Sequence, residues 1–349
     1  MIILLKGLII FLTIVISLPA SVTVGNENYC CNANACVVMD CSSKTVFYSD
    51  NEDTQMPIAS TTKIMTCFLA CESDKLSEVV TITDEMVNTH GSLIYLRVGD
   101  RITLVDLVKG ALLASGNDAA NAIAIALGGS IENFVNIMNN RATQIGMDNT
   151  LFVTPSGLDE GNHHSTAKDM ALLTAKALEN PLFSDLCKLK SSEIFVSDKK
   201  QVIYNHNKLL SYSDNFVGVK TGYTDKAGRC LVSAYNYNDN IIVCVTLNDY
   251  DDWQDHKNLV KKAKTEYVRY NSEKELNISL VGANRNSVKC KYEYDVYSLS
   301  DIYVKVYYYP FVYAPVKIGD TVGFVVVYNK DKIIKKVPLV ASEGINSYG

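Results

Sequence analysis

The sequence lacks any surplus of basic residues. Its 349 residues include 33 lysines and arginines against 38 aspartates and glutamates, which gives a formal net charge of −5. A nucleic-acid-binding surface needs clustered positive charge, so we expect no nucleic-acid partner. The chain also lacks internal repeats and low-complexity segments, and hydrophobic residues make up 48% of it. This composition is typical of folded globular domains, and the length indicates two or three of them.

Only the start of the chain resembles a targeting segment. Lys6 supplies a short basic region, residues 7–18 are almost wholly apolar, and small residues follow Pro19. An apolar core of about 12 residues is too short to span a bilayer comfortably. We therefore expect residues 1–25 to be a cleaved signal peptide and the protein to be exported to the outer face of the cell envelope or secreted. An uncleaved N-terminal anchor is the alternative.

Tight Cys-x2-Cys pairs are missing among the 10 cysteines. Zinc sites commonly use such pairs, so the looser cluster Cys30, Cys31, Cys36 and Cys41 favours disulfides or buried free thiols over a metal site. Cys230 and Cys244 lie on neighbouring strand-like runs and could pair across a hairpin, but sequence does not determine connectivity. The adjacent histidines 163 and 164 lack a further spaced ligand. We expect no metal and no organic cofactor.

The periodicity of apolar residues divides the chain into two regions. Two short strands are expected within residues 35–48. Helical periodicity follows over 60–71, 104–114, 119–127, 131–145 and 166–178. Strand patterns then cover 194–196, 202–204, 231–234 and 241–247, and a helix is expected over 255–270. Beyond Asn271 the pattern is wholly that of strands, with candidates at 303–309, 321–328 and 333–338. The sequence thus predicts an α/β (α+β) domain over residues 26–272, in which a helical subdomain is inserted between strands, and a small all-β domain over residues 273–349.

Three short motifs occur in order along the first of these domains. They are Ser60-Thr61-Thr62-Lys63 (S-x-x-K), Ser115-Gly116-Asn117 (S-x-N) and Lys220-Thr221-Gly222 (K-T-G). Residues i and i+3 share a helix face, so Lys63 is expected beside Ser60. A serine hydroxyl becomes a good nucleophile only when a base accepts its proton. A lysine can be that base if burial or a nearby cation, here Lys220, lowers its pKa.

Each motif is weak when taken alone. S-x-x-K also occurs at residues 165–168 and 197–200, whereas K-T-G occurs once. Ser60 could simply cap a helix, and the other two motifs could be turns. Their order, the helical context of Ser60 and the export signal together favour a serine hydrolase. This set of motifs is the one found in class A β-lactamases and penicillin-binding proteins.

The segments around the motifs resemble the D-alanyl-D-alanine carboxypeptidases of the low-molecular-mass penicillin-binding proteins. The resemblance extends over roughly residues 30–270, with a looser match in the β domain. It is carried by residues 57–66, 114–120, 155–159, 164–170, 205–210 and 220–228. Three residues depart from the pattern common in the family: Ser156, His206 and Val217. These departures bear on the preferred substrate and not on the identity of the nucleophile.

The resemblance implies a fold like that of serine β-lactamases and transpeptidases, with the helical subdomain inserted in an antiparallel sheet. It also implies catalytic roles. Ser60 would form an acyl-enzyme with the peptide, Lys63 would take its proton, and Ser115 would relay a proton to the leaving amine.

The implied substrate is a peptidoglycan stem peptide ending in D-Ala-D-Ala, and β-lactams would be covalent inhibitors. Asn117 would bind the peptide amide, and Lys220 and Thr221 the terminal carboxylate. Gly222 belongs to the same binding strand, and the backbone N–H of Tyr223 would form the oxyanion hole with that of Ser60.

Three other functions stay open at this point. A peptidoglycan DD-endopeptidase would have the same residues. A β-lactamase would need a glutamate in an E-x-x-L-N context, which does not follow Ser115. A non-catalytic wall-binding protein would not need the intact motifs. The family's amphipathic C-terminal anchor is not evident after Val340, so membrane-surface association stays open as well.

Overall fold

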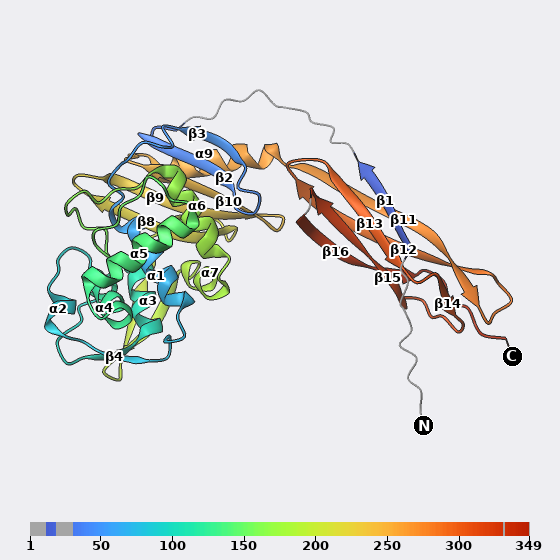
Figure 1. Ribbon diagram of the computed structural model, residues 1–349, viewed down its shortest axis with the longest axis horizontal. Helices are drawn as coiled ribbons and strands as arrows, with labels where there is room; N and C mark the ends of the chain where they lie inside the picture. The colour runs from blue at the N-terminus through green and yellow to red at the C-terminus, as the bar shows by residue number, and fades with distance from the viewer. Residues whose placement is uncertain (1–11, 19–30, 331, 349) are drawn as a thin grey trace. The chain divides into compact units, whose positions relative to one another are not determined.

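The structure, a computed structural model, describes residues 12–18, 31–330 and 332–348. These residues form two compact units, each with its own hydrophobic core (Figure 1). Residues 31–264 form the first unit. Residues 265–348 form the second together with the strand at 12–18. No helix in the described ranges is long and apolar enough to cross a membrane.

The first unit contains an antiparallel sheet of five strands in the order β3-β2-β10-β9-β8. The strands are β2 (Ala35–Asp40), β3 (Val46–Asp50), β8 (Phe216–Thr224), β9 (Gly228–Tyr237) and β10 (Asn240–Leu247). β10 lies between two other strands and is buried along most of its length, which explains its continuous apolar sequence. The strands predicted within 35–48, 231–234 and 241–247 are confirmed.

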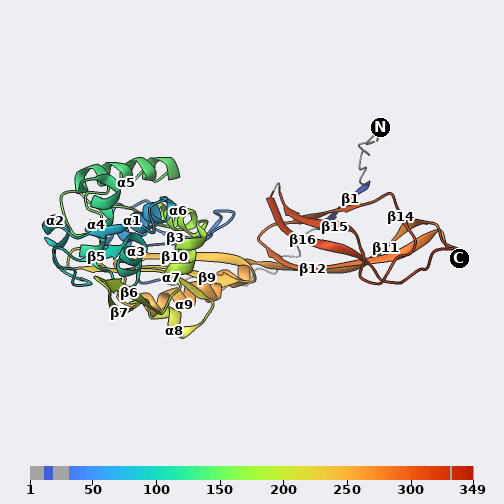
Figure 2. The same cartoon turned by 90° about the horizontal axis from the view of Figure 1, so that it is seen from below.

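Helices cover both faces of this sheet (Figure 2). α6 (Ala167–Leu178) packs against β2 and β10 on one face, and α9 (Asp252–Ala263) packs against β9 and β10 on the other. Successive side chains of a strand point to opposite faces. Val245 accordingly belongs to the core on the α6 side, whereas Thr246 hydrogen-bonds His256 of α9.

The remaining helices lie between β3 and β8 in the chain, so the helical subdomain is inserted in the sheet as predicted. They are α1 (Lys63–Glu72), α2 (Asp84–Val87), α3 (Leu104–Leu113), α4 (Asn117–Gly128), α5 (Ile131–Ile145), α7 (Pro181–Cys187) and α8 (Leu209–Tyr212). Two small antiparallel sheets of two strands accompany them: β4 (Val79–Thr81) with β5 (Arg101–Thr103), and β6 (Ser191–Val196) with β7 (Lys199–Tyr204). α5 has the predicted range, residues 131–145. Ser130 caps its first turn, and Gly146, with φ 88°, ends the helix.

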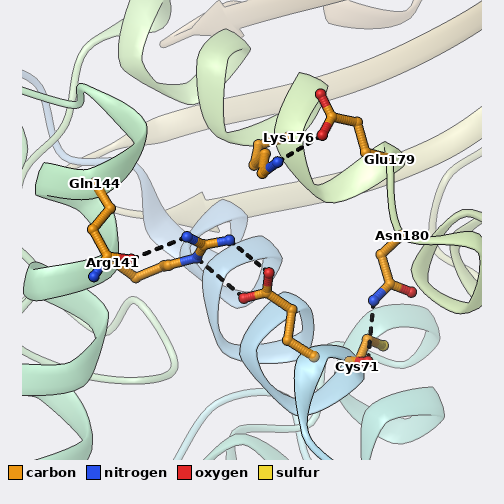
Figure 3. A network of polar contacts seen from close by, with 7 residues as sticks. Cys71, Arg141, Gln144, Lys176, Glu179 and Asn180 are labelled. Carbon is orange, nitrogen blue, oxygen red and sulfur yellow. Dashed lines mark hydrogen bonds and ion pairs between the residues drawn. The ribbon is translucent and has the colours of Figure 1, made fainter.

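Polar contacts hold the C-terminal end of α1 (Figure 3). Arg141 of α5 forms an ion pair of 2.6 Å with Glu72, the last residue of α1, and a hydrogen bond with Gln144. Asn180, between α6 and α7, donates to the carbonyl of Cys71 at 3.1 Å. α1 is therefore fixed at the end away from Ser60.

The second unit is a seven-stranded sheet in the order β1-β13-β15-β16-β12-β11-β14. The strands are β1 (Leu12–Leu18), β11 (Val268–Val281), β12 (Ser287–Ser298), β13 (Ile302–Tyr308), β14 (Phe311–Tyr313), β15 (Thr321–Asn329) and β16 (Lys332–Ala341). Buried and exposed residues alternate along β12, which places Tyr292, Tyr294 and Val296 in the core. The strands expected within 303–309, 321–328 and 333–338 are confirmed.

Three expectations need correction or completion. The helix expected over 255–270 ends at Ala263, and β11 begins at Val268 because it pairs with β12 over nearly its whole length. Cys230 lies opposite Leu247 rather than Cys244, and both thiols are free, so the suggested hairpin disulfide is wrong. Within the expected signal peptide, β1 pairs with β13, whereas residues 1–11 and 19–25 lie outside the described residues.

Candidate active site

Ser60 lies in a sharp turn just before α1. The turn Ala59–Thr62 is a 3-10 helix, and Lys63 is the first residue of α1. The predicted i, i+3 contact is present, because Nζ of Lys63 lies 2.8 Å from Oγ of Ser60. Ala59 has φ 46°, a left-handed conformation that residues with a side chain rarely adopt. Backbone strain of this kind is typical of functional sites.

The Lys63 side chain is fully buried. Its Nζ also contacts Oδ1 of Asn117 and the carbonyl of Ser156, each at 2.7 Å. Burial, and then the nearby charge of Lys220, hold the pKa of Lys63 well below its usual value. A neutral amine has two N–H donors and one lone pair. The two N–H groups of a neutral Lys63 can donate to Oδ1 of Asn117 and to the carbonyl of Ser156. The lone pair then remains free to accept the hydroxyl proton of Ser60.

A second buried amine lies behind Ser115. Nζ of Lys220 donates to Oγ of Ser115 at 3.0 Å and to the carbonyl of Thr221 at 2.9 Å. Burial lowers the pKa of Lys220 to about 7. Ser115 has φ 60°, so it too has a strained backbone. Among the described hydrogen bonds none joins Ser115 directly to Lys63.

Asn117, the first residue of α4, uses both ends of its amide. Oδ1 accepts from Lys63, and Nδ2 donates to the carbonyl of His90 at 2.5 Å. The amide therefore holds the lysine in place.

The predicted residues gather at one cavity of about 350 Å³. Five of the eight line it: Ser60, Ser115, Thr221, Gly222 and Tyr223. The other three are buried next to these residues: Lys63, Asn117 and Lys220. Larger cavities of about 850 and 690 Å³ in the second unit contain none of the predicted residues.

Strand β8 forms one wall of the cavity and passes very close to the nucleophile. A Cβ added at Gly222 would lie 3.0 Å from the backbone nitrogen of Ser60 and 3.1 Å from the carbonyl of Ile58. Glycine therefore allows the strand to approach the turn, which places the backbone of Tyr223 beside that of Ser60. Two backbone N–H groups near a nucleophile are the usual components of an oxyanion hole.

Sequence reasoning missed most of the remaining wall. Its residues are Ser92, His206, Lys208, Arg229, Asp252 and Trp253. Arg229 donates to Asp252 at 2.6 Å, and its guanidinium lies 5.6 Å from the centre of the Trp253 ring. Burial, and then Lys220, lower the pKa of His206. Of these, His206 stood out in the sequence, and Lys208 lies with it in the segment 205–210 that resembles the family. The other four residues come from segments that no short motif connects.

His163 joins the turn of Ser60 to the neighbouring loop. Nε2 lies 2.8 Å from Oγ1 of Thr62, and Nδ1 accepts from the backbone N–H of Val153 at 3.1 Å. Burial lowers the pKa of His163 to about 4, so the ring is neutral and its Nε2–H donates to Thr62. The histidine thus supports the loop whose residue Ser156 contacts Lys63.

Two family models match the chain and together account for nearly all of it. Residues 22–251 match the model described as D-alanyl-D-alanine carboxypeptidase. Residues 253–347 match the model described as penicillin-binding protein 5, C-terminal domain. The expected combination of a mixed α/β catalytic domain and an all-β C-terminal domain is confirmed.

Curated relatives and solved structures agree with these matches. The D-alanyl-D-alanine carboxypeptidase DacF of Bacillus subtilis is 27% identical, with 91% of this chain and 87% of DacF covered. DacC of Escherichia coli is 35% identical, with 70% and 60% covered. The crystal structure of DacD from Francisella tularensis has a TM-score of 0.64 at 25% identity, covering 94% of this chain and 97% of that one. Penicillin-binding protein 5 from Haemophilus influenzae has a TM-score of 0.65 at 26% identity, covering 93% and 100%.

The carboxypeptidase model covers well over half of the residues, and it includes all three motifs and every residue that lines the cavity except Asp252 and Trp253. The chain therefore belongs to the D-alanyl-D-alanine carboxypeptidase family, a family of serine hydrolases.

Proposed function

We propose that this protein removes the terminal D-alanine from peptidoglycan stem peptides through an acyl-enzyme on Ser60. The observation that carries the proposal is the contact of 2.8 Å between Oγ of Ser60 and Nζ of the fully buried Lys63. A buried, neutral lysine beside a serine is a base next to a nucleophile.

In the first step Lys63 accepts the Ser60 proton while Oγ attacks the carbonyl between the two D-alanines. The backbone N–H groups of Ser60 and Tyr223 stabilise the oxyanion. Ser115, whose hydroxyl Lys220 holds, relays a proton to the leaving amine: it donates its own hydroxyl proton and receives the one that Lys63 took from Ser60. Free D-alanine departs, and water then hydrolyses the ester to regenerate Ser60.

Lys220 and Thr221 select the free carboxylate of the terminal residue. Their ammonium and hydroxyl groups supply a charge-assisted hydrogen bond and a second donor, which are the strong type of contact for a carboxylate. Asn117 fixes Lys63, and Gly222 borders the path of the peptide. Binding of the peptide amide by Asn117, which the resemblance implies, would require its side chain to give up one of its two present partners. β-Lactams carry a similar carboxylate and would acylate Ser60 as slowly released inhibitors.

We also propose that the protein acts outside the cytoplasm. The apolar sequence within residues 7–18, preceded by Lys6, supports export by a signal peptide over residues 1–25. Peptidoglycan as a substrate requires this location.

The first test is mass spectrometry of the intact chain after incubation with benzylpenicillin, followed by peptide mapping. One adduct on Ser60 is expected, and Ser60→Ala should carry none. Ser197→Ala, in a second S-x-x-K sequence, is the matched control and should be labelled like the unaltered chain. An adduct elsewhere, or none, would contradict the assignment.

The second test separates the proposed reaction from its relatives. A pentapeptide ending in D-Ala-D-Ala should release D-alanine at least about tenfold faster than its C-terminal amide is cut, which is roughly 1.4 kcal/mol of transition-state binding. Faster cleavage of cross-linked peptides would indicate an endopeptidase. Rapid turnover of penicillin without a lasting adduct would indicate a β-lactamase.

A further inference from the structure

Three side chains that could bind a metal meet outside the catalytic cavity. They are Cys31, which precedes β2, Asp249, which follows β10, and Asp255 in the first turn of α9. One ligand atom from each, the thiol sulfur and a carboxylate oxygen of each aspartate, lies within 4.8 Å of the other two. The backbone brings them together, because the N–H of Asn32 donates to Oδ2 of Asp255 at 2.7 Å.

One oxygen of this cluster is buried without a partner. Asp249 is 0% exposed, and its Oδ2 has no hydrogen-bond partner within the described part of the chain. The other oxygen accepts from the backbone N–H of Asp251 at 3.1 Å. A buried carboxylate oxygen that is left unpaired is strongly unfavourable, so this atom points to a missing ligand.

Neither of the two carboxylates has a positively charged side chain as its partner among the described residues. Across the residues that the structure describes, neither Asp249 nor Asp255 forms an ion pair with a lysine, arginine or histidine. The adjacent His256 is fully buried, and its two ring nitrogens contact the hydroxyls of Ser233 and Thr246 rather than either carboxylate.

We propose that Cys31, Asp249 and Asp255 form a binding site for a divalent transition metal ion, with Zn²⁺ as the best fit. A thiolate ligand selects against Mg²⁺ and Ca²⁺, which prefer oxygen alone. Zinc accepts a mixture of sulfur and carboxylate oxygen in tetrahedral sites, and water would complete the coordination here. The sequence favoured thiols or disulfides for this cysteine cluster because the carboxylates come from a distant segment.

The proposed metal site lies at both ends of a segment that forms part of the wall of the catalytic cavity. Asp252 and Trp253 lie between the two aspartate ligands in the chain and line the catalytic cavity. A metal ion held by Asp249 and Asp255 fixes both ends of this segment to the start of the first unit at Cys31. We expect bound zinc to raise the unfolding temperature of the chain.

The test uses the full chain, reduced and then dialysed against Zn²⁺ buffered by a weak chelator. Elemental mass spectrometry should find about one zinc per chain, as expected of a site with three protein ligands. Cys31→Ser and Asp249→Asn should each weaken zinc binding at least about thirtyfold, since even indirect supports of a metal contribute 10–100-fold. Cys41→Ser is the matched control. Cys41 is another half-buried cysteine from the same stretch of sequence but is not a proposed ligand, so this variant should bind zinc normally.

Cobalt provides a second readout that does not depend on affinity. Co²⁺ in place of Zn²⁺ should give a thiolate-to-metal charge-transfer band that is absent from Cys31→Ser. The proposal is overturned if the reduced chain retains no zinc, or if both ligand variants bind zinc like the control. It is also overturned if peptide mapping of protein exported with zinc present finds Cys31 and Cys36 joined in a disulfide.

Discussion

At the scale of single residues, the site depends on two lysines that are buried without a carboxylate beside them. Lys63 and Lys220 are 0% and 1% exposed, and their hydrogen-bond partners are neutral oxygens. Burial of an ammonium group disfavours its charged form. In the proposed mechanism the protein thus uses burial, rather than a histidine, to obtain a base near neutral pH.

Lys63→Arg should abolish most of the acylation. Arginine keeps a positive charge but cannot deprotonate, so Ser60 loses its base. We expect the rate of penicillin acylation, followed by mass spectrometry, to fall about a thousandfold, within the range known for general bases. Lys200→Arg, in the exposed S-x-x-K sequence, is the control. Acylation by Lys63→Arg at nearly the original rate would mean that another group accepts the proton.

Lys220→Met should show how much the buried ammonium group of Lys220 lowers the free energy of unfolding. Between pH 7 and 10.5 the unfolded chain carries a proton on Lys220 that the folded chain has released. The free energy of unfolding therefore rises with pH through this group, and the full penalty applies below pH 7. Lys220→Met removes the penalty, so urea unfolding should find the variant more stable at pH 6 and its advantage smaller at pH 9. An advantage that does not change with pH would contradict the lowered pKa.

The site residues differ in how far sequence could predict them. The i, i+3 spacing of Ser60 and Lys63 is a local property, so their contact follows from the helix alone. The carbonyl of Ser156 is a backbone atom with no sequence signature. Arg229, Asp252 and Trp253 become neighbours of the motifs only when β9 pairs with β8 and α9 packs against β9. These contacts depend on tertiary structure and could not be predicted.

At the scale of elements, the loop that includes Gly157 must lie against the turn of Ser60. Gly157 has φ 84°, and a Cβ there would lie 1.9 Å from the carbonyl oxygen of Ala59. Gly99 has φ 88° with no atom within 4 Å of such a Cβ. The two glycines thus share a conformation but differ in their surroundings.

Gly157→Ala should therefore cost more stability than Gly99→Ala. The left-handed conformation alone costs about 1 kcal/mol. Steric overlap with Ala59 should bring the total for Gly157→Ala to at least about 3 kcal/mol. Urea unfolding measures both variants, and Gly157→Ala should also acylate more slowly because the turn of Ser60 must shift. Equal losses for the two variants would show that the loop moves away freely.

Element boundaries were predictable where local signals and packing agree. Ser130 and Gly146 mark both ends of α5, and the predicted range is correct. The helix expected to continue to residue 270 fails because a strand pairing, which a local pattern does not contain, begins at Val268. Helix propensity at the end of α9 is overridden by the partner strand β12.

At the scale of the whole molecule, all predicted catalytic and binding residues lie within residues 27–264. We propose that this segment folds and catalyses by itself. A chain limited to residues 27–264 should hydrolyse a small soluble D-Ala-D-Ala peptide within about threefold of the full chain, since compact units with their own core can fold alone. Circular dichroism and a cooperative unfolding transition establish that it is folded. A folded truncation without activity would assign part of the catalysis to residues 265–349.

The insertion of the helical subdomain between β3 and β8 also has a consequence for synthesis. Ser60 and Lys63 are made early, whereas Lys220 and Gly222 follow only after all the inserted helices. In the proposed mechanism, a nascent chain that ends before β8 has the nucleophile and its base but lacks the strand that binds the carboxylate and completes the oxyanion hole. We therefore expect Ser60 to stay unreactive toward substrate and penicillin until β8 has been made.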